Sequence, residues 1–192
     1  MKRIREKKHG RRRIQTLAVT VVVLVFSAMA LPAAAQQSEP LNLSDVAVRM
    51  NPETLEKVSR MIVEPVQKRF SDRAATEDML GEPKERRATE HQSIHDPDYT
   101  FEEVVLDFPA CRVSFFVFPD REVFSAFEGD PAEAGVEELE VGQAAGEIEN
   151  LLGKSVKRPQ DMLYSDGEWW LVRFVLDSND HLREMELYIF FD

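Results

Sequence analysis

The chain has 192 residues, of which 24 are Lys or Arg and 35 are Asp or Glu, so its formal net charge is −11. Residues 1–35 hold eight of the basic residues and one of the acids, so the remaining chain has 16 basic and 34 acidic residues and a net charge of −18. Such a surface favours solubility and disfavours nucleic acid as a partner, because phosphate binding needs a basic surface.

The first 35 residues have the pattern of an export signal. Residues 1–16 are strongly basic, residues 17–31 are apolar or small, and Ala33 and Ala35 form an A-x-A cleavage site. Basic, apolar and small-residue regions in this order are typical of a secretory signal peptide. We therefore expect cleavage after Ala35 and a mature N-terminus at Gln36.

The same segment has an alternative interpretation as an uncleaved anchor. Residues 17–35 approach the ~20 residues that a helix needs to cross a bilayer. Pro32 and the alanines that follow it favour cleavage. We expect a periplasmic protein that contacts the membrane only through the transient signal.

Residues 36–50 are predicted to form a flexible N-terminal tail, and the first helix signal follows it. Asn51 precedes Pro52, which is the arrangement of an N-cap residue and a proline at the first helical position. Apolar residues then recur at helical spacing until Pro65, which is expected to end or kink the helix.

A second short helix is predicted over residues 72–80. Gly81 suits the left-handed position just past a helix end, and Pro83 prevents continuation. The same plan recurs near the C-terminus, where an amphipathic helix ends at Gly153 and a basic loop follows. Both glycines are therefore expected to have positive φ.

Residues 84–99 are predicted to form a long polar loop. This segment contains His91 and His95, which are ligand-type residues and would share one face if the segment were helical. The run Asp96-Pro97-Asp98 favours a turn instead, and no third ligand follows at a recognisable spacing.

Strand patterns fill much of the remaining chain. The lone cysteine, Cys111, cannot form an intramolecular disulfide, and it alternates in phase with apolar neighbours, so we expect it to be buried. Residues 130–140 are acidic and are predicted to be a linker. Strands are expected over residues 101–108, 111–118, 123–128, 162–165, 168–176 and 182–191, with a hairpin turn at Asp166-Gly167.

Short motifs in both halves resemble a known repeat. The first half contains Leu80-Gly81-Glu82-Pro83, and the second contains Val141-Gly142-Gln143-Ala144, Ile148, Leu152-Gly153-Lys154-Ser155, Tyr164 and Trp169-Trp170. This pattern resembles the repeat of the beta-lactamase inhibitory protein and of SmpA/OmlA (BamE-like) envelope domains. Ala144 and Ser155 depart from it, and neither the inhibitor's disulfides nor the envelope proteins' lipid-anchor cysteine has a counterpart here.

The resemblance implies an α+β fold. Two tandem repeats, residues 51–130 and 131–192, each consisting of a helix and an antiparallel meander, would share one sheet with the helices packed on one face. Alternation along the strands then places one apolar set of side chains toward the helices. The opposite set mixes aromatic and charged residues, which is the composition of a recognition surface. Its candidate partner-binding residues are Phe116, Phe118, Trp169, Tyr188, Arg112 and Arg173.

The outer face also has a purely structural interpretation. Long strands can curl and cover their own outer face, or the segment 84–99 can lie across it. Binding remains the functional hypothesis: an exported periplasmic interaction module, either an inhibitor-like binder or an envelope-assembly accessory, with an unknown envelope or secreted protein as partner. No catalytic residue or cofactor is assigned. The alternative is a metal-dependent hydrolase or metal-binding protein that uses His91 and His95.

Overall fold

A computed structural model of the chain describes residues 46–93 and 99–190, all of which belong to the unit Pro40–Asp192. The expected cleavage-site residues Ala33, Ala35 and Gln36 lie outside the described residues, as does His95. None of the helices in the described ranges has both the length and the apolar character of a membrane span.

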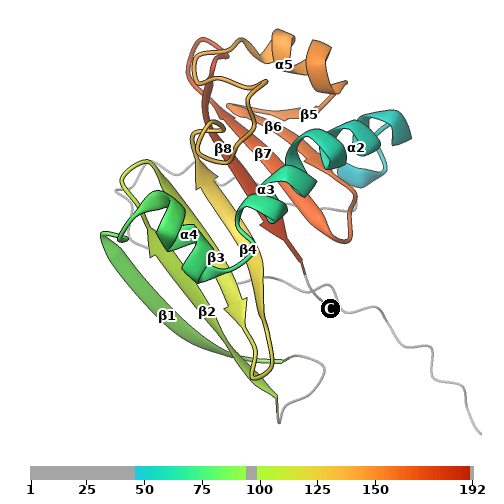
Figure 1. The fold of residues 1–192 in the computed structure, drawn as a ribbon. Helices are drawn as coiled ribbons and strands as arrows, with labels where there is room; N and C mark the ends of the chain where they lie inside the picture. Colours follow the sequence, from blue (N-terminus) through green and yellow to red (C-terminus); the bar gives the residue numbers. More distant parts are fainter. Residues whose placement is uncertain (1–45, 94–98, 191–192) are drawn as a thin grey trace, which may run out of the picture. The chain divides into compact units, whose positions relative to one another are not determined.

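A single antiparallel sheet contains all eight strands of the described residues, so the α+β class with one antiparallel sheet is confirmed. Its strand order is β1-β2-β3-β4-β8-β7-β6-β5, which is two four-strand meanders joined where β4 pairs with β8 (Figure 1). The strands are β1 (Glu85–Gln92), β2 (Thr100–Asp107), β3 (Cys111–Val117), β4 (Glu122–Gly129), β5 (Val156–Arg158), β6 (Asp161–Ser165), β7 (Trp170–Leu176) and β8 (Leu182–Ile189).

The first helical path runs further than the sequence predicts. It consists of α2 (Pro52–Val58), a π-helical turn η1 (Ser59–Val63) and α3 (Glu64–Arg69). Of the two outcomes expected at Pro65, an end or a kink, the structure rules out an end, because Pro65 lies in the first turn of α3. A proline has no N–H and clashes with the carbonyl four residues earlier, and the wider π turn directly before it accommodates both defects. The start is as predicted, since Asn51 Oδ1 accepts the Glu53 N–H at 2.8 Å.

Two further helices of the described residues each end at a glycine. α4 (Arg73–Leu80) is capped by Asp72, whose Oδ1 accepts the Ala75 N–H at 2.8 Å, and it ends at Gly81 with φ 86°. α5 (Ala145–Leu152) ends at Gly153 with φ 106°. The positive φ predicted for both glycines is confirmed.

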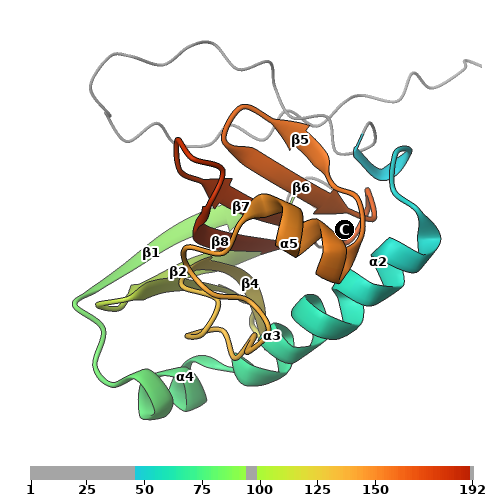
Figure 2. The same cartoon turned by 90° about the horizontal axis from the view of Figure 1, so that it is seen from above.

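The main core lies between the sheet and the helices, which occupy one side of it (Figure 2). Trp170 is buried there, as is Cys111, whose predicted burial is confirmed, and the loop after β4 adds Ala134, Val136 and Leu139. The helices contribute Val58, Ile62, Val63, Val66, Ala145, Ile148 and Leu152, Phe70 directly follows α3, and the sheet contributes Val113, Phe115, Val172, Phe174, Met185 and Leu187.

A smaller cluster lies on the opposite face of the sheet. Val46 packs there against Leu163 of β6 and Leu171 of β7. Val46 and Met50 are both buried, although the sequence places them in a flexible tail. The segment before α2 therefore covers part of the face that the helices leave open.

The prediction of a loop over residues 84–99 is wrong for its first half, because Glu85–Gln92 forms β1. Every residue of β1 is exposed or half-buried, so no apolar alternation marks it as a strand. Continuous pairing with β2, from Glu85 opposite Asp107 to Gln92 opposite Thr100, holds it in the sheet. The prediction of a basic loop after Gly153 is also wrong in part, because Val156–Arg158 forms the short edge strand β5. None of the three residues of β5 is buried, so no apolar alternation marks this strand either.

Candidate functional site

The outer face of the sheet, opposite the helices, carries a cluster of four aromatic rings near one end of β2 and β3. We call Tyr99, Phe101, Phe116 and Phe118 the aromatic cluster. Phe101 is its centre, with its ring centroid 5.3 Å from that of Phe116 and 5.3 Å from that of Phe118. Tyr99 stacks on Phe118 at 6.1 Å. All four side chains remain half-buried, so the cluster is packed within itself and still reaches the surface.

Two polar side chains frame the aromatic cluster. The guanidinium of Arg121 lies 5.2 Å above the Phe118 ring in a cation–π contact. The His91 ring stacks on Phe101 at 5.4 Å, and its Nε2 lies 3.1 Å from Glu103 Oε2. Nowhere in residues 46–93 and 99–190 do three side chains of metal-ligating type come together. The structure thus places His91 at the margin of the cluster, beside a carboxylate.

A row of paired charges crosses the same face, and we call it the charged belt. In the first meander, Arg112 Nε donates to Asp107 Oδ1 at 2.6 Å and Nη1 donates to Glu128 Oε2 at 2.9 Å. Asp107 also accepts from Arg87 at 2.6 Å. Burial alone would raise the pKa of Asp107, but the bonds from the two arginines outweigh it and lower that pKa.

The second meander repeats this pairing with the same arginine atoms. Arg173 Nε donates to Asp161 Oδ1 at 3.0 Å, and its Nη1 donates to Glu186 Oε2 at 3.1 Å. In each meander the arginine lies on the third strand, the aspartate on the second and the glutamate on the fourth. The charged belt therefore consists of two matching Asp–Arg–Glu sets that meet at the β4–β8 pair.

Tyr188 lies at that meeting point. Glu128 and Glu186 are direct partners in the β4–β8 register, and the Tyr188 hydroxyl is 3.3 Å from Glu128 Oε1 and 3.1 Å from Glu186 Oε2. Burial raises the pKa of Glu186, with the Glu128 charge adding to it, and the opposing effects of Arg173 and Tyr188 do not cancel this rise. Burial and the two carboxylates also raise the pKa of the Tyr188 phenol.

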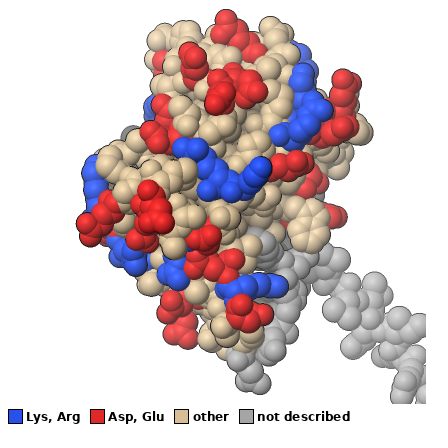
Figure 3. All heavy atoms as spheres, viewed as in Figure 1, with Lys and Arg blue, Asp and Glu red and all other residues tan. Residues whose placement is uncertain are grey.

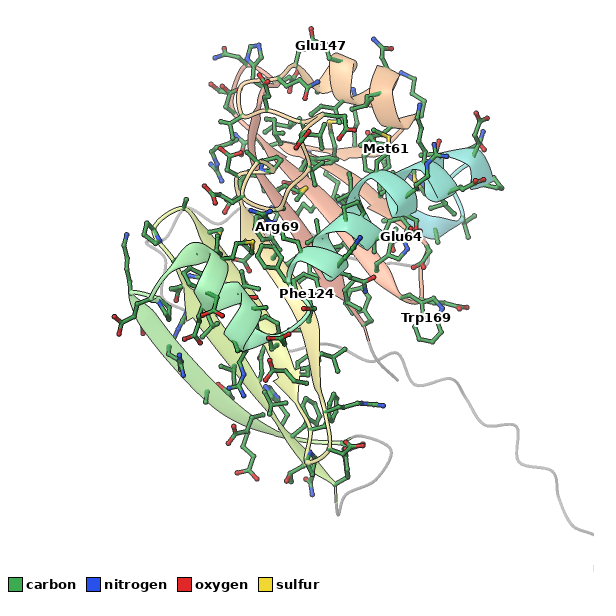
Figure 4. The ribbon with its side chains drawn as sticks, viewed as in Figure 1. Met61, Glu64, Arg69, Phe124, Glu147 and Trp169 are labelled. Atoms are coloured by element: carbon green, nitrogen blue, oxygen red, sulfur yellow. The ribbon has the colours of Figure 1, made fainter. Side chains whose placement is uncertain are left out.

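The six residues predicted for the site occupy three places. Phe116 and Phe118 belong to the aromatic cluster, and Arg112, Arg173 and Tyr188 belong to the charged belt. Trp169 is 55% exposed and projects outward from the turn directly before β7 (Figure 4). Asp166 Oδ1 accepts the Trp169 N–H at 2.8 Å, which fixes the turn that presents the ring.

Sequence reasoning missed several members of these groups. Tyr99 and Phe101 share the strand parity of Glu103, so alternation extended to these two residues would have placed them on the outer face. Asp107 and Glu128 follow from the register of β2 and β4 with β3. Alternation gives the face of a side chain, but only the strand register gives its neighbours.

Two shallow hollows on the helix side of the molecule include carboxylates in their linings. Arg60, Met61, Pro65, Gly135, Glu137 and Glu138 line the first hollow, and Glu138, Glu140, Val141, Gly142, Gln143 and Glu147 line the second. Acidic and basic side chains are interspersed over this face (Figure 3).

One carboxylate on the helix side is nearly buried and accepts hydrogen bonds at both of its oxygens. The side chain of Glu149 is 7% exposed and accepts bonds from Lys154 Nζ at 3.0 Å and Ser155 Oγ at 2.9 Å. Lys157 Nζ lies 3.3 Å away. Burial by itself would raise the pKa of Glu149, but the bonds from Lys154, Ser155 and Lys157 lower it to about 2. Glu149 thus joins the end of α5 to the loop that follows it.

Comparison with known proteins gives one structural neighbour. A DUF4309 family protein, YjgB from Bacillus subtilis, aligns with 71% of this chain and 99% of its own, with 13% sequence identity and a TM-score of 0.35. No family model matches the sequence. No curated protein matches it either.

Proposed function

We propose that the chain is an exported periplasmic protein-interaction module that binds an envelope or secreted protein through the outer face of its sheet. One observation carries the proposal: four aromatic rings contact one another on that face while remaining half-buried. Aromatic side chains of this kind provide large, rigid contact areas and dominate the energy of protein interfaces.

The arrangement around the aromatic cluster supports this assignment. Residues 85–92 pair into the sheet as β1, so they do not lie across the cluster as a covering loop would. The segment before α2 covers the face elsewhere, at Leu163 and Leu171. Arg121 and His91 provide polar groups at the margin of the cluster, as in an interface with an apolar centre and a polar rim. We include Trp169, which is exposed and directly precedes β7, in the candidate surface.

The finer architecture that we propose is a tandem repeat, with residues 51–130 and 131–192 as its units. The strand order is symmetric about the β4–β8 pair, and a helix that ends at a glycine with positive φ precedes each meander. The two Asp–Arg–Glu sets use the same guanidinium atoms. Such matched details support a duplicated unit resembling the inhibitor and SmpA/OmlA repeats, as either an inhibitor-like binder or an envelope-assembly accessory.

Export is the second part of the proposal. The basic, apolar and A-x-A regions of residues 1–35 support secretion with cleavage after Ala35. N-terminal sequencing of the protein from fractionated cells should give Gln36 as the first residue in the periplasmic fraction. Recovery of residues 17–35 in the membrane fraction would show an anchored protein instead.

The binding surface is tested by a matched pair of substitutions. Phe118→Ala should weaken capture of the partner from an envelope extract by ~2 kcal/mol or more, the scale of an interface hot spot. Met79→Ala is the control, because Met79 is an exposed apolar residue on α4, away from the outer face. Equal capture by both variants would remove the aromatic cluster from the interface.

The metal hypothesis is tested on the same protein. Titration with zinc or calcium should show no stoichiometric site that a His91→Ala/His95→Ala double variant abolishes. The contact of His91 with Phe101 and Glu103 supports a place in the rim of the aromatic cluster. A stoichiometric site lost in the double variant would favour the metal-binding alternative.

A further inference from the structure

The two edges of the sheet differ in a way that bears on association. β5 has only three residues, includes Lys157, and is followed by Pro159, all of which discourage another strand from pairing with it. β1 is eight residues long and pairs with β2 without a bulge. On its other side no strand of the described residues pairs with it. β1 is therefore the edge at which the sheet could be extended.

The charges along β1 are self-complementary in an antiparallel pair. If two copies pair about a two-fold axis at Ala88, Arg86 of each copy lies opposite Glu90 of the second copy, and Glu85 lies opposite His91 of the second copy. Opposed residues in antiparallel strands share one face of the sheet, so these side chains meet. The Arg86–Glu90 pairs bring opposite charges together, and the Glu85–His91 pairs place an imidazole beside a carboxylate.

Neighbouring registers lack this match. An axis at Thr89 puts Arg87 opposite His91 and Ala88 opposite Glu90. An axis at Arg87 puts the two Arg87 side chains opposite each other. Like charges directly opposite each other in a sheet are destabilising. The charge pattern of residues 85–91 thus selects the register with Ala88, a small exposed residue, at the axis.

The environment of Glu90 and Arg86 within one copy provides a second argument. Glu90 lies directly opposite Glu102 of β2, and both are exposed. A cation at this position would relieve the repulsion between the two carboxylates. Arg86 is 52% exposed and uses one N–H to bind Glu77 of α4 at 2.6 Å, so its guanidinium fork keeps donors for a second carboxylate. Basic and acidic groups lie along the rim of the molecule where β1 is found (Figure 3).

We propose that two copies of this chain associate through β1, pairing antiparallel about Ala88 and joining their two sheets into one. Main-chain hydrogen bonds would supply affinity, as in other cases of strand addition, and the Arg86–Glu90 pairs would set the register. Residues 36–192 have a net charge of −18, which opposes association. β1 has two arginines and two glutamates, so it is a locally balanced strip at which two acidic copies can approach.

Sedimentation equilibrium across a concentration series, on protein purified from cells that express the full-length chain, tests the association. We expect a reversible dimer. Arg86→Glu and Glu90→Arg should each raise the dissociation constant about tenfold or more, since each turns two attractive contacts into repulsive ones. The double variant Arg86→Glu/Glu90→Arg should restore the dimer, because the reversed charges still pair.

Two controls separate this pairing from general effects. Glu138→Arg makes the same change in net charge as Glu90→Arg, at an exposed position on the helix side, and should not weaken the dimer. Glu90→Gln keeps the shape of the side chain and should weaken the dimer less than Glu90→Arg. A monomer at all concentrations, a dimer insensitive to the single reversals, or a double variant that stays monomeric with an intact melting transition would each overturn the proposal.

Discussion

Glu128 of β4 and Glu186 of β8 lie directly opposite each other at the centre of the sheet, with the Tyr188 hydroxyl 3.3 Å from one carboxylate and 3.1 Å from the other. A single phenol proton can serve only one of the two carboxylates at a time. Arg112 and Arg173 flank the pair and partly neutralise it. At the centre of the outer face, two neighbouring carboxylates of the charged belt therefore repel each other.

This arrangement predicts that Glu186→Gln will leave stability at pH 7 unchanged or raised. The pKa of Glu186 is higher in the fold than its ordinary value of 4.5, so folding stabilises the protonated form relative to the charged form. Its stabilising contribution is complete below pH 4.5 and is lost as pH rises through the folded pKa. A glutamine mimics the protonated form and can donate to Glu128. Urea unfolding of both proteins at pH 7 and pH 4 measures the effect, and a clear loss at pH 7 would contradict it.

Glu149 should respond with the opposite sign. The pKa of this carboxyl is about 2 in the fold and 4.5 ordinarily, so its contribution is present above pH 4.5 and is lost as pH falls toward 2. Glu149→Gln should therefore cost about 2–3 kcal/mol at neutral pH. Its stability should also change less than that of the wild type between pH 4.5 and pH 2. Parallel pH profiles for the two proteins would show that Lys154 and Ser155 do not hold the charged form.

The two glycines at helix ends should differ in their sensitivity to substitution. Gly81→Ala meets no atom within 4 Å and faces only the backbone penalty of its φ of 86°, which is about 1–3 kcal/mol. Gly153→Ala has a similar backbone penalty and also collides with Thr54 Oγ1 on α2, so it should cost more. Chemical denaturation ranks the two variants, and Thr54→Ala in the Gly153→Ala background should recover part of the difference. Equal losses at both sites would refute this close approach of α2 to Gly153.

Trp169 and Trp170 are neighbours with opposite roles. Trp170 is 7% exposed and belongs to the main core, so Trp170→Ala should cost ~3–5 kcal/mol of fold stability. Trp169 is more than half exposed, so Trp169→Ala should change stability little while weakening partner capture. Thermal melting and capture are measured on both variants. If Trp169→Ala melts as early as Trp170→Ala, the Trp169 ring is part of the fold and not of a binding surface.

Much of the fold could be predicted from local chemistry. Asn51 and Pro52 mark the start of α2, the glycines mark the ends of α4 and α5, and alternation separates Trp170 from Trp169. β1 could not be predicted, because a polar edge strand has neither a buried face nor an apolar period. The first helix continues through Pro65 because of the π turn before it, and no single residue in the sequence predicts that turn.

The candidate site could be predicted only in outline. Phe116 and Phe118 were found because they alternate away from the core, whereas their contacts with Phe101 depend on how β2 pairs with β3. Arg112 and Arg173 were expected to flank a binding patch. In the structure they are bound by Asp107, Glu128, Asp161 and Glu186, partners brought together by the register of six strands.

Site-specific photo-crosslinking in living cells tests the binding function most directly. A photoreactive phenylalanine analogue is placed at Phe118 in the aromatic cluster, at Trp169, or at the control position Met79 on α4. We predict one discrete adduct of the same mass from the Phe118 and Trp169 positions and no such adduct from Met79. Adding Phe101→Ala to the protein that carries the analogue at Phe118 should abolish its adduct. The absence of an adduct at both Phe118 and Trp169 would contradict a partner-binding outer face. An adduct of equal yield at Met79 would contradict it as well.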